Sequence, residues 1–197
     1  MGRFHIRYWA KAAVFTAALW LCLASAGRIL TPKFFINQTW PATATYLGFY
    51  QMEENTVDVL FFGSSHAVSH FSPQKLYDEY GIRSYNLGSD GQNLLVSYYW
   101  LLEALRFQTP KAVVLDCYML FPYDWNEALN TSESCTRKAI DYMKWSGVKR
   151  AAVKDICALD EKQSAASYYF PNIRYHTRWL SLNEDDFTYR EMSAHYE

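Results

Sequence analysis

The sequence predicts an α/β domain built on an open parallel sheet and preceded by an apolar N-terminal segment. Three short runs rich in β-branched and aromatic residues, at 56–62, 82–87 and 111–116, are typical of buried strands. Helical patterns at 72–80 and 93–107 separate them, and this β-α-β-α-β order is typical of an open sheet with right-handed crossovers. With 197 residues, 50% of them hydrophobic, the chain can bury a core.

The N-terminal segment has the layout of a membrane anchor or an export signal. Residues 12–27 carry no charge, and residues 1–11 before them hold three basic and no acidic side chains. The positive-inside bias therefore places residues 1–11 in the cytoplasm and the rest of the chain on the outer side of the membrane. We favour an uncleaved transmembrane anchor. The alternative is a signal peptide cleaved after Ala26, because Ala24-Ser25-Ala26 has the small-x-small form of a cleavage site.

The remaining elements follow in order along the chain. Residues 28–52 are rich in Thr and aromatic residues and contain two prolines, which predicts a juxtamembrane stalk before a domain at 53–197. Ser72 and Pro73 are typical of a helix start, and Gly81 of its end.

The C-terminal part of the domain has weaker patterns. The helix at 93–107 is so apolar that it must be largely buried, and further helices are expected at 137–144 and 148–159. No strand is evident in the last thirty residues. Three strands make a thin sheet for this class, so we expect the domain to be incomplete at its C-terminal end.

Charge and cysteine content narrow the function classes. The net charge of -1 supplies no field that would attract nucleic acid. The four cysteines lack metal-ligand spacing, so no metal site is expected. Cys135 and Cys157 can pair in an oxidising compartment, and buried free thiols are the alternative.

Candidate functional residues follow the strand ends, where open α/β sheets carry their sites. Ser65 lies in the Gly63-Ser64-Ser65-His66 turn, which can lift a hydroxyl out of the sheet as a nucleophile. A plain helix N-cap is the alternative. The loop from Gly88 to Asn93 can bring a backbone N–H close to the same point, or can be an ordinary tight turn.

These two motifs resemble the SGNH (GDSL-like) hydrolase superfamily. They are Phe-Phe-Gly-Ser-Ser-His at 61–66 and Tyr-Asn-Leu-Gly-Ser-Asp-Gly-Gln at 85–92. The resemblance is stronger to its membrane-attached, extracytoplasmic branch, which is similar to alginate O-acetyltransferases and the D-alanyl-lipoteichoic acid biosynthesis protein. It implies a three-layer α/β/α flavodoxin-like fold with Ser65 as nucleophile and Gly88 as an oxyanion donor.

Two features of the family's pattern have no counterpart in this sequence. Asp116-Cys117-Tyr118 occupies the strand end where the family has an asparagine, so Asn93 or Gln92 is the candidate substitute as oxyanion donor. No histidine lies in the family's Asp-x-x-His motif, so the catalytic base and acid are absent from this chain. His66 is a weak substitute because adjacent side chains point apart.

Other uses of the same side chains stay open. His66 and His70 are expected to face the same way on a helix, where they could hold a metal, although no third ligand is visible. Packing or support of the site is the alternative for both. The aromatic residues at 168–170 suit sugar stacking or core packing.

The sequence as a whole predicts an extracytoplasmic serine esterase or O-acyltransferase. Ser65 is expected to form an acyl-enzyme with an acylated cell-envelope polysaccharide or a small ester, without a cofactor, and a membrane acyltransferase is a candidate partner. The alternative is a non-catalytic, membrane-attached glycan-binding accessory protein. Without its base, we expect the 197-residue chain alone to show no esterase turnover above background and to have marginal stability.

Overall fold

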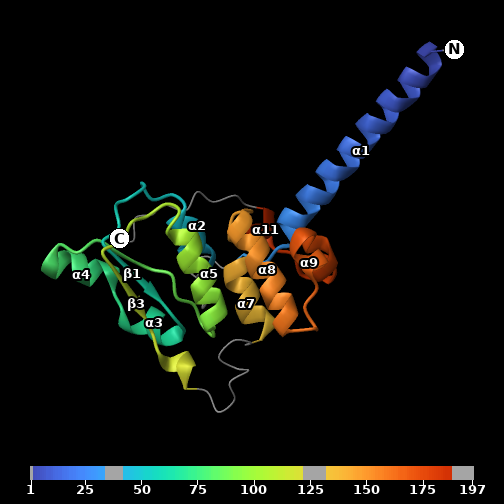
Figure 1. Cartoon of the computed structure of the whole chain (residues 1–197). Helices are drawn as coiled ribbons and strands as arrows, with labels where there is room; N and C mark the ends of the chain where they lie inside the picture. Colours follow the sequence, from blue (N-terminus) through green and yellow to red (C-terminus); the bar gives the residue numbers. More distant parts are fainter. Residues whose placement is uncertain (1, 34–41, 122–131, 188–197) are drawn as a thin grey trace. The chain divides into compact units, whose positions relative to one another are not determined.

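The computed structural model describes residues 2–33, 42–121 and 132–187, and the chain divides into two compact units. The first, the α1 unit, comprises residues 1–33 and 166–189. The second, the sheet unit, comprises residues 34–165 and 190–197. Figure 1 shows the long helix of the first unit and the sheet of the second.

The sheet unit contains a small, open, three-stranded parallel sheet, which confirms the predicted α/β class. β1 (Val59–Phe62) lies in the middle, between β2 (Ser84–Asn86) and β3 (Ala112–Leu115). The first residue of β1 is paired with the first residue of each neighbour. Three of the four β1 residues are buried, as expected of a strand covered on both faces.

Helices cover both faces of this sheet. α3 (Ser65–His70) and α4 (Pro73–Tyr80) connect β1 to β2, and α5 (Leu94–Ala104) connects β2 to β3. Because β2 and β3 lie on opposite sides of β1, right-handed crossovers place these connections on opposite faces. Figure 1 shows α4 and α5 on opposite sides of the sheet. Phe61 of β1 stacks on Phe71, just after α3, with ring centroids 4.4 Å apart.

The prediction of a stalk at 28–52 is wrong for its second half. α2 (Ala42–Phe49) lies in this range and is part of the core of the sheet unit. Tyr46 stacks on Trp100 of α5 with ring centroids 4.5 Å apart, and both are fully buried. Phe49 meets the edge of Tyr85 at 5.7 Å. Aromatic side chains bury large apolar areas. These rings therefore hold α2 in the core of the sheet unit, although the local sequence pattern of this segment indicated only irregular chain.

α7 (Glu133–Ile140) and α8 (Gly147–Leu159) pack beside α5. α7 begins and ends four residues before the helix predicted at 137–144, because Ser132 caps it by accepting the N–H of Cys135 at 3.4 Å. The helix predicted at 148–159 is confirmed, with one more residue at its start.

β3 is the exposed edge of the described sheet. Val113 and Leu115 keep 44% and 42% of their surface accessible, unlike the buried residues of β1. The described residues therefore reproduce the thin sheet and open edge that the sequence predicts.

The α1 unit is a long helix with short helices packed on its C-terminal part. α1 (Gly2–Leu30) contains the whole predicted span, and its stretch 6–30 is long and apolar enough to cross a membrane. α10 (Pro171–Tyr175), η2 (His176–Ser181) and α11 (Glu184–Phe187) contact it. They follow α9 (Ala165–Tyr169), so the described part of residues 166–189 is free of strands, as predicted.

Candidate functional site

One carboxylate from β3 holds the turn that follows β1. Ser64 donates its hydroxyl to Asp116 Oδ2 at 2.6 Å and its backbone N–H to the same oxygen at 3.2 Å. Ser64 is also the N-cap of α3, and its Oγ accepts the N–H of His66 at 3.3 Å. Because Asp116 directly follows β3, these bonds join the carboxyl ends of two adjacent strands.

The same turn requires a glycine before the two serines. Gly63 has φ +143°, and a Cβ at this position would lie 2.4 Å from the Cβ of Asp116. Glycine alone tolerates both this backbone conformation and this approach. The glycine of the Gly-Ser-Ser motif is thus explained by the close approach of the chain to Asp116 at the point where β1 ends.

Asp116 supplies the fixed negative charge of the site. Burial alone would raise the pKa of Asp116, but the hydrogen bonds from Ser64 and from the Tyr118 N–H hold it below the usual carboxyl value. The Tyr118 N–H reaches Asp116 Oδ1 at 2.9 Å. From the sequence, Asp116 is recognisable only as the residue in place of an asparagine, and this role was not predicted. The sequence signal for this role was the position of Asp116, directly after a predicted strand that neighbours β1.

Ser65 differs from Ser64 in exposure and in hydrogen bonding. It is the first residue of α3 and is partly exposed, whereas Ser64 is 2% exposed. Within the described ranges, Ser65 Oγ has no hydrogen-bond partner. The two serines therefore have separate roles: Ser64 holds the turn, and the Ser65 hydroxyl is available to a ligand or substrate.

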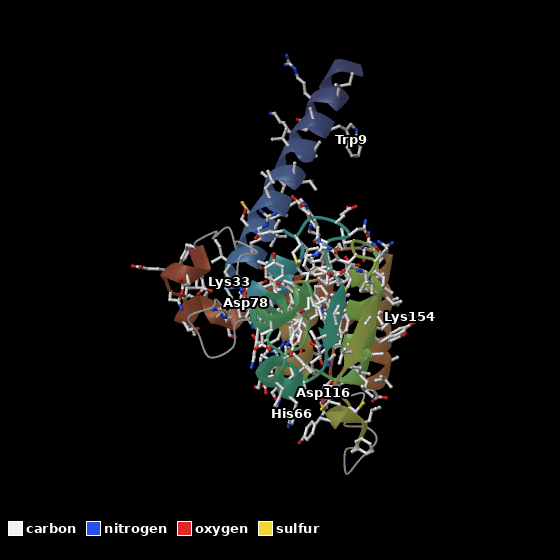
Figure 2. All side chains as sticks on the ribbon, turned by 90° about the vertical axis from the view of Figure 1, so that its left-hand side faces the viewer. Trp9, Lys33, His66, Asp78, Asp116 and Lys154 are labelled. Atoms are coloured by element: carbon white, nitrogen blue, oxygen red, sulfur yellow. The ribbon has the colours of Figure 1, made fainter. Side chains whose placement is uncertain are left out.

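His66 lies beside this turn without reaching Ser65. Its Nδ1 is 3.3 Å from Ser64 Oγ, and its ring packs on Tyr118 with centroids 4.1 Å apart. Figure 2 shows His66 and Asp116 at the same end of the sheet. His66 and His70 face the same way, as predicted, with ring centroids 5.9 Å apart. The described residues contain no group of three side chains that could hold a metal ion.

The loop after β2 approaches the same turn, as the glycine pattern predicts. A Cβ on Gly88 would lie 3.0 Å from the carbonyl oxygen of Gly63, and the Ser89 N–H donates to that oxygen at 3.1 Å. The Gly88 N–H donates to Asn86 Oδ1 at 3.0 Å, and Asn86 Nδ2 donates to the Ala67 carbonyl at 2.8 Å. Asn86 belongs to the second motif, and sequence reasoning gave it no role.

The other two candidate oxyanion donors have internal partners. Gln92 is buried, and its Oε1 accepts from Tyr46 at 2.6 Å while its Nε2 donates to the Leu87 carbonyl at 3.1 Å. Asn93 caps α5, with its Oδ1 accepting the Val96 N–H at 2.8 Å. Both side chains join the loop after β2 to the core.

The strand order places this region at a switch point of the sheet. In the order β2-β1-β3, the connection from β1 leads to the neighbour on one side and the next connection, from β2, leads to the neighbour on the other side; ligands of open α/β sheets commonly bind outside the carboxyl ends at such a point. Ser64, Ser65 and Asp116 lie at the ends of β1 and β3. The arrangement can present one free hydroxyl to a polar ligand, beside a fixed carboxylate.

The cysteines stand apart from this chemistry. All four lie in the described ranges and are unpaired, with Cys22 and Cys117 exposed and the other two half-buried. Cys135 and Cys157 do not form a disulfide, so the thiols are free, as the alternative predicts, but none of them is fully buried.

Comparisons with family models, with curated proteins and with solved structures each found no match to this chain.

Proposed function

We propose that the chain carries the nucleophile of an SGNH-type ester hydrolase or O-acyltransferase with a flavodoxin-like sheet, acting on the outer side of a membrane. The observation that carries this proposal is the division of labour between the two serines. Asp116 fixes Ser64 at the switch point, whereas Ser65, the next residue, is partly exposed and makes no side-chain hydrogen bond in the part of the chain that the structure describes. A serine nucleophile needs a fixed backbone and a hydroxyl that can hydrogen-bond to a general base.

In the proposed reaction, Ser65 Oγ attacks the carbonyl carbon of an ester and passes its proton to a general base. The alcohol leaves, and the acyl group remains on Ser65 until water or an acceptor hydroxyl takes it. No base contacts Ser65 within the described residues, because the Nδ1 of His66 lies 3.3 Å from the Oγ of Ser64 instead. An Asp-x-x-His pair of the kind that the family resemblance implies would supply it.

The oxyanion site needs a local rearrangement. Gly88 lies close to Gly63, the residue before the two serines, but its N–H is bound to Asn86. A substrate oxyanion would have to replace Asn86 Oδ1 as the acceptor of this N–H. An oxyanion is the stronger acceptor, because hydrogen bonds to ionised groups exceed neutral ones.

The proposed substrate is an acylated cell-envelope polysaccharide or a small ester. The support for this setting is α1, whose apolar stretch suits a membrane anchor. A membrane acyltransferase that delivers the acyl group is the proposed partner, and no cofactor is needed for this chemistry.

A second function, glycan binding without catalysis, is favoured by the internal hydrogen bonds of the candidate oxyanion donors. The Gly88 N–H and Gln92 Nε2 donate to groups inside the protein, and the Asn93 side chain accepts a hydrogen bond as the cap of α5. A binding protein of this fold could hold a hydroxyl-rich ligand at Ser65 and Asp116 with no base at all.

A fluorophosphonate probe, which reacts with activated serines, separates the two functions. If the chain is an enzyme, a version of the protein that includes the Asp-x-x-His pair should be labelled. In that version, Ser65→Ala should lose the label, and Ser64→Ala should keep most of it. A glycan-binding protein should show no labelling in any version, but should bind acetylated polysaccharide in a manner that Ser65→Ala weakens. Equal labelling of the wild type and Ser65→Ala would contradict the assignment of the nucleophile.

A further inference from the structure

The short helices of the α1 unit expose large apolar side chains next to the C-terminal end of the apolar stretch of α1. We define residues 166–187 as the collar. Its exposed large hydrophobic residues have between 45% and 73% of their surface accessible, and they are Tyr169, Phe170, Ile173, Trp179, Leu180 and Phe187. Large exposed apolar patches on a folded protein mark an interaction surface.

The collar is bonded to α1 at defined levels of the helix. Asn172 donates to the Leu23 carbonyl at 2.8 Å, and Arg178 donates to the Leu30 carbonyl at 2.6 Å. At 1.5 Å per residue, these carbonyls are about 10 Å apart along the helix axis. The collar therefore covers the last two turns of α1 and leaves the earlier turns exposed.

An ion pair within the collar stabilises it beside the C-terminal end of α1. Arg178 also donates to Asp186 at 2.9 Å, while Lys33 donates to the Asp186 carbonyl at 3.0 Å and to the Arg28 carbonyl at 2.9 Å. Asp186 is buried, so this carboxylate is paired rather than exposed. Trp179 and Leu180, which follow Arg178 directly, are thus held beside the end of α1.

The free length of α1 matches the thickness of a membrane core. The rise from Ile6 to Leu23 is about 26 Å, close to the roughly 30 Å hydrocarbon core of a bilayer, and Arg7 and Lys11 near its start have long side chains whose charged ends can extend to the headgroups on the cytoplasmic side. Trp9 lies on α1 toward its N-terminal end, where Figure 2 shows it on the exposed helix. At the other end, Trp20 meets the edge of Phe170 at 6.2 Å. Aromatic rings at both ends of an apolar span are typical of membrane interfaces.

We propose that the collar lies in the interface of the bilayer that α1 crosses, with Ile173, Trp179 and Leu180 inserted among the lipids. The partner is the lipid surface itself, since the apolar surfaces of α1 and the collar are continuous across the Trp20–Phe170 contact. The collar has two basic and three acidic residues, so charge supplies no attraction to anionic lipid. Insertion rests on apolar area, and a zwitterionic lipid is sufficient. This inference is independent of the chemistry of Ser65.

Spin labels test the proposal in the full-length chain. The native cysteines are replaced by alanine, and single cysteines are introduced as Ile173→Cys and Leu180→Cys for a nitroxide label. The references are Val14→Cys on α1 and Tyr80→Cys on α4, which are 70% and 68% exposed. The proteins are placed in phosphatidylcholine nanodiscs, and collisions with oxygen, which partitions into lipid, are compared with collisions with a water-soluble nickel complex.

The labels at 173 and 180 should fall between the label at 14, which lies near the middle of the span, and the label at 80. We expect their oxygen-to-nickel collision ratio to exceed that of the label at 80 several-fold, because the lipid at the interface concentrates oxygen and excludes the water-soluble nickel complex. A ratio equal to that at 80 for either label would overturn the proposal. Protection from both reagents would also overturn it, because a protein surface such as a second copy of the chain would then cover the collar. Circular dichroism of each labelled protein checks that it is folded, and a label at Trp179→Cys provides a second position on η2.

Discussion

The turn that presents Ser65 should depend on the carboxylate of Asp116. Asp116→Ala removes the acceptor of two Ser64 donors, the hydroxyl at 2.6 Å and the N–H at 3.2 Å. Ser64 is 2% exposed, so water cannot easily replace the lost acceptor. Hydrogen bonds to a charged group contribute about 1.5–3 kcal/mol each, and the two donors share one oxygen, so we expect a loss of about 2–4 kcal/mol.

Asp116→Asn should cost less, about 1–2 kcal/mol, because it keeps one acceptor oxygen but loses the charge. If that oxygen faces Ser64, the new amide NH₂ opposes the Tyr118 N–H, which now bonds to Asp116 Oδ1. The matched control is Asp78→Asn on the exposed face of α4, which should change stability by less than about 0.5 kcal/mol.

Urea unfolding of the chain in detergent micelles measures these differences, and hydrogen exchange of the Ser64 amide locates them. Because the folded pKa of Asp116 is lowered, its stabilisation is complete above the ordinary carboxyl pKa of about 3.9 and disappears as the pH falls through the lower folded value. The gap between wild type and Asp116→Asn should therefore shrink in acid. A loss for Asp116→Ala no larger than that for Asp78→Asn would refute the role assigned to this carboxylate.

Two further predictions concern a buried lysine and the topology of the chain. Burial lowers the pKa of Lys149 to about 8, although its Nζ donates to the Met143 carbonyl at 2.8 Å. Between that value and the ordinary lysine pKa, the unfolded chain binds more protons than the folded one, so the unfolding free energy should rise by about 1–3 kcal/mol from pH 8 to 10. Urea titrations of Lys149→Met should show no such rise. An equal rise in the variant would exclude Lys149 as its source. A reporter active only in the cytoplasm, fused after Glu197, should stay silent because the basic residues before the apolar run orient α1, and a bright signal would contradict export.

Local sequence patterns predicted the secondary-structure elements better than they predicted the contacts between those elements. The β-branched and aromatic composition of the three strands and the residues that end them are encoded locally, so β1, β2 and β3 were predictable, together with the approach of Gly88 to the first turn. α2 was not, because its attachment depends on Tyr46 reaching Trp100, more than fifty residues away in the sequence. A contact of that separation leaves no period in the sequence.

The candidate site shows the same division at the level of single atoms. Sequence alone placed Ser65, Gly88 and Asp116 at strand ends that must meet at one edge of a parallel sheet. It could not show that Asp116 binds Ser64, or that the Gly88 N–H is occupied by Asn86.

In the same way, the apolar run of the sequence determined that α1 suits a membrane, while only the tertiary structure showed the collar bonded to its last turns. The physical reason is common to all these cases. Hydrophobic periodicity is a local property that fixes secondary structure and burial, whereas the partner of each polar group is decided by geometry between distant segments once the core has formed.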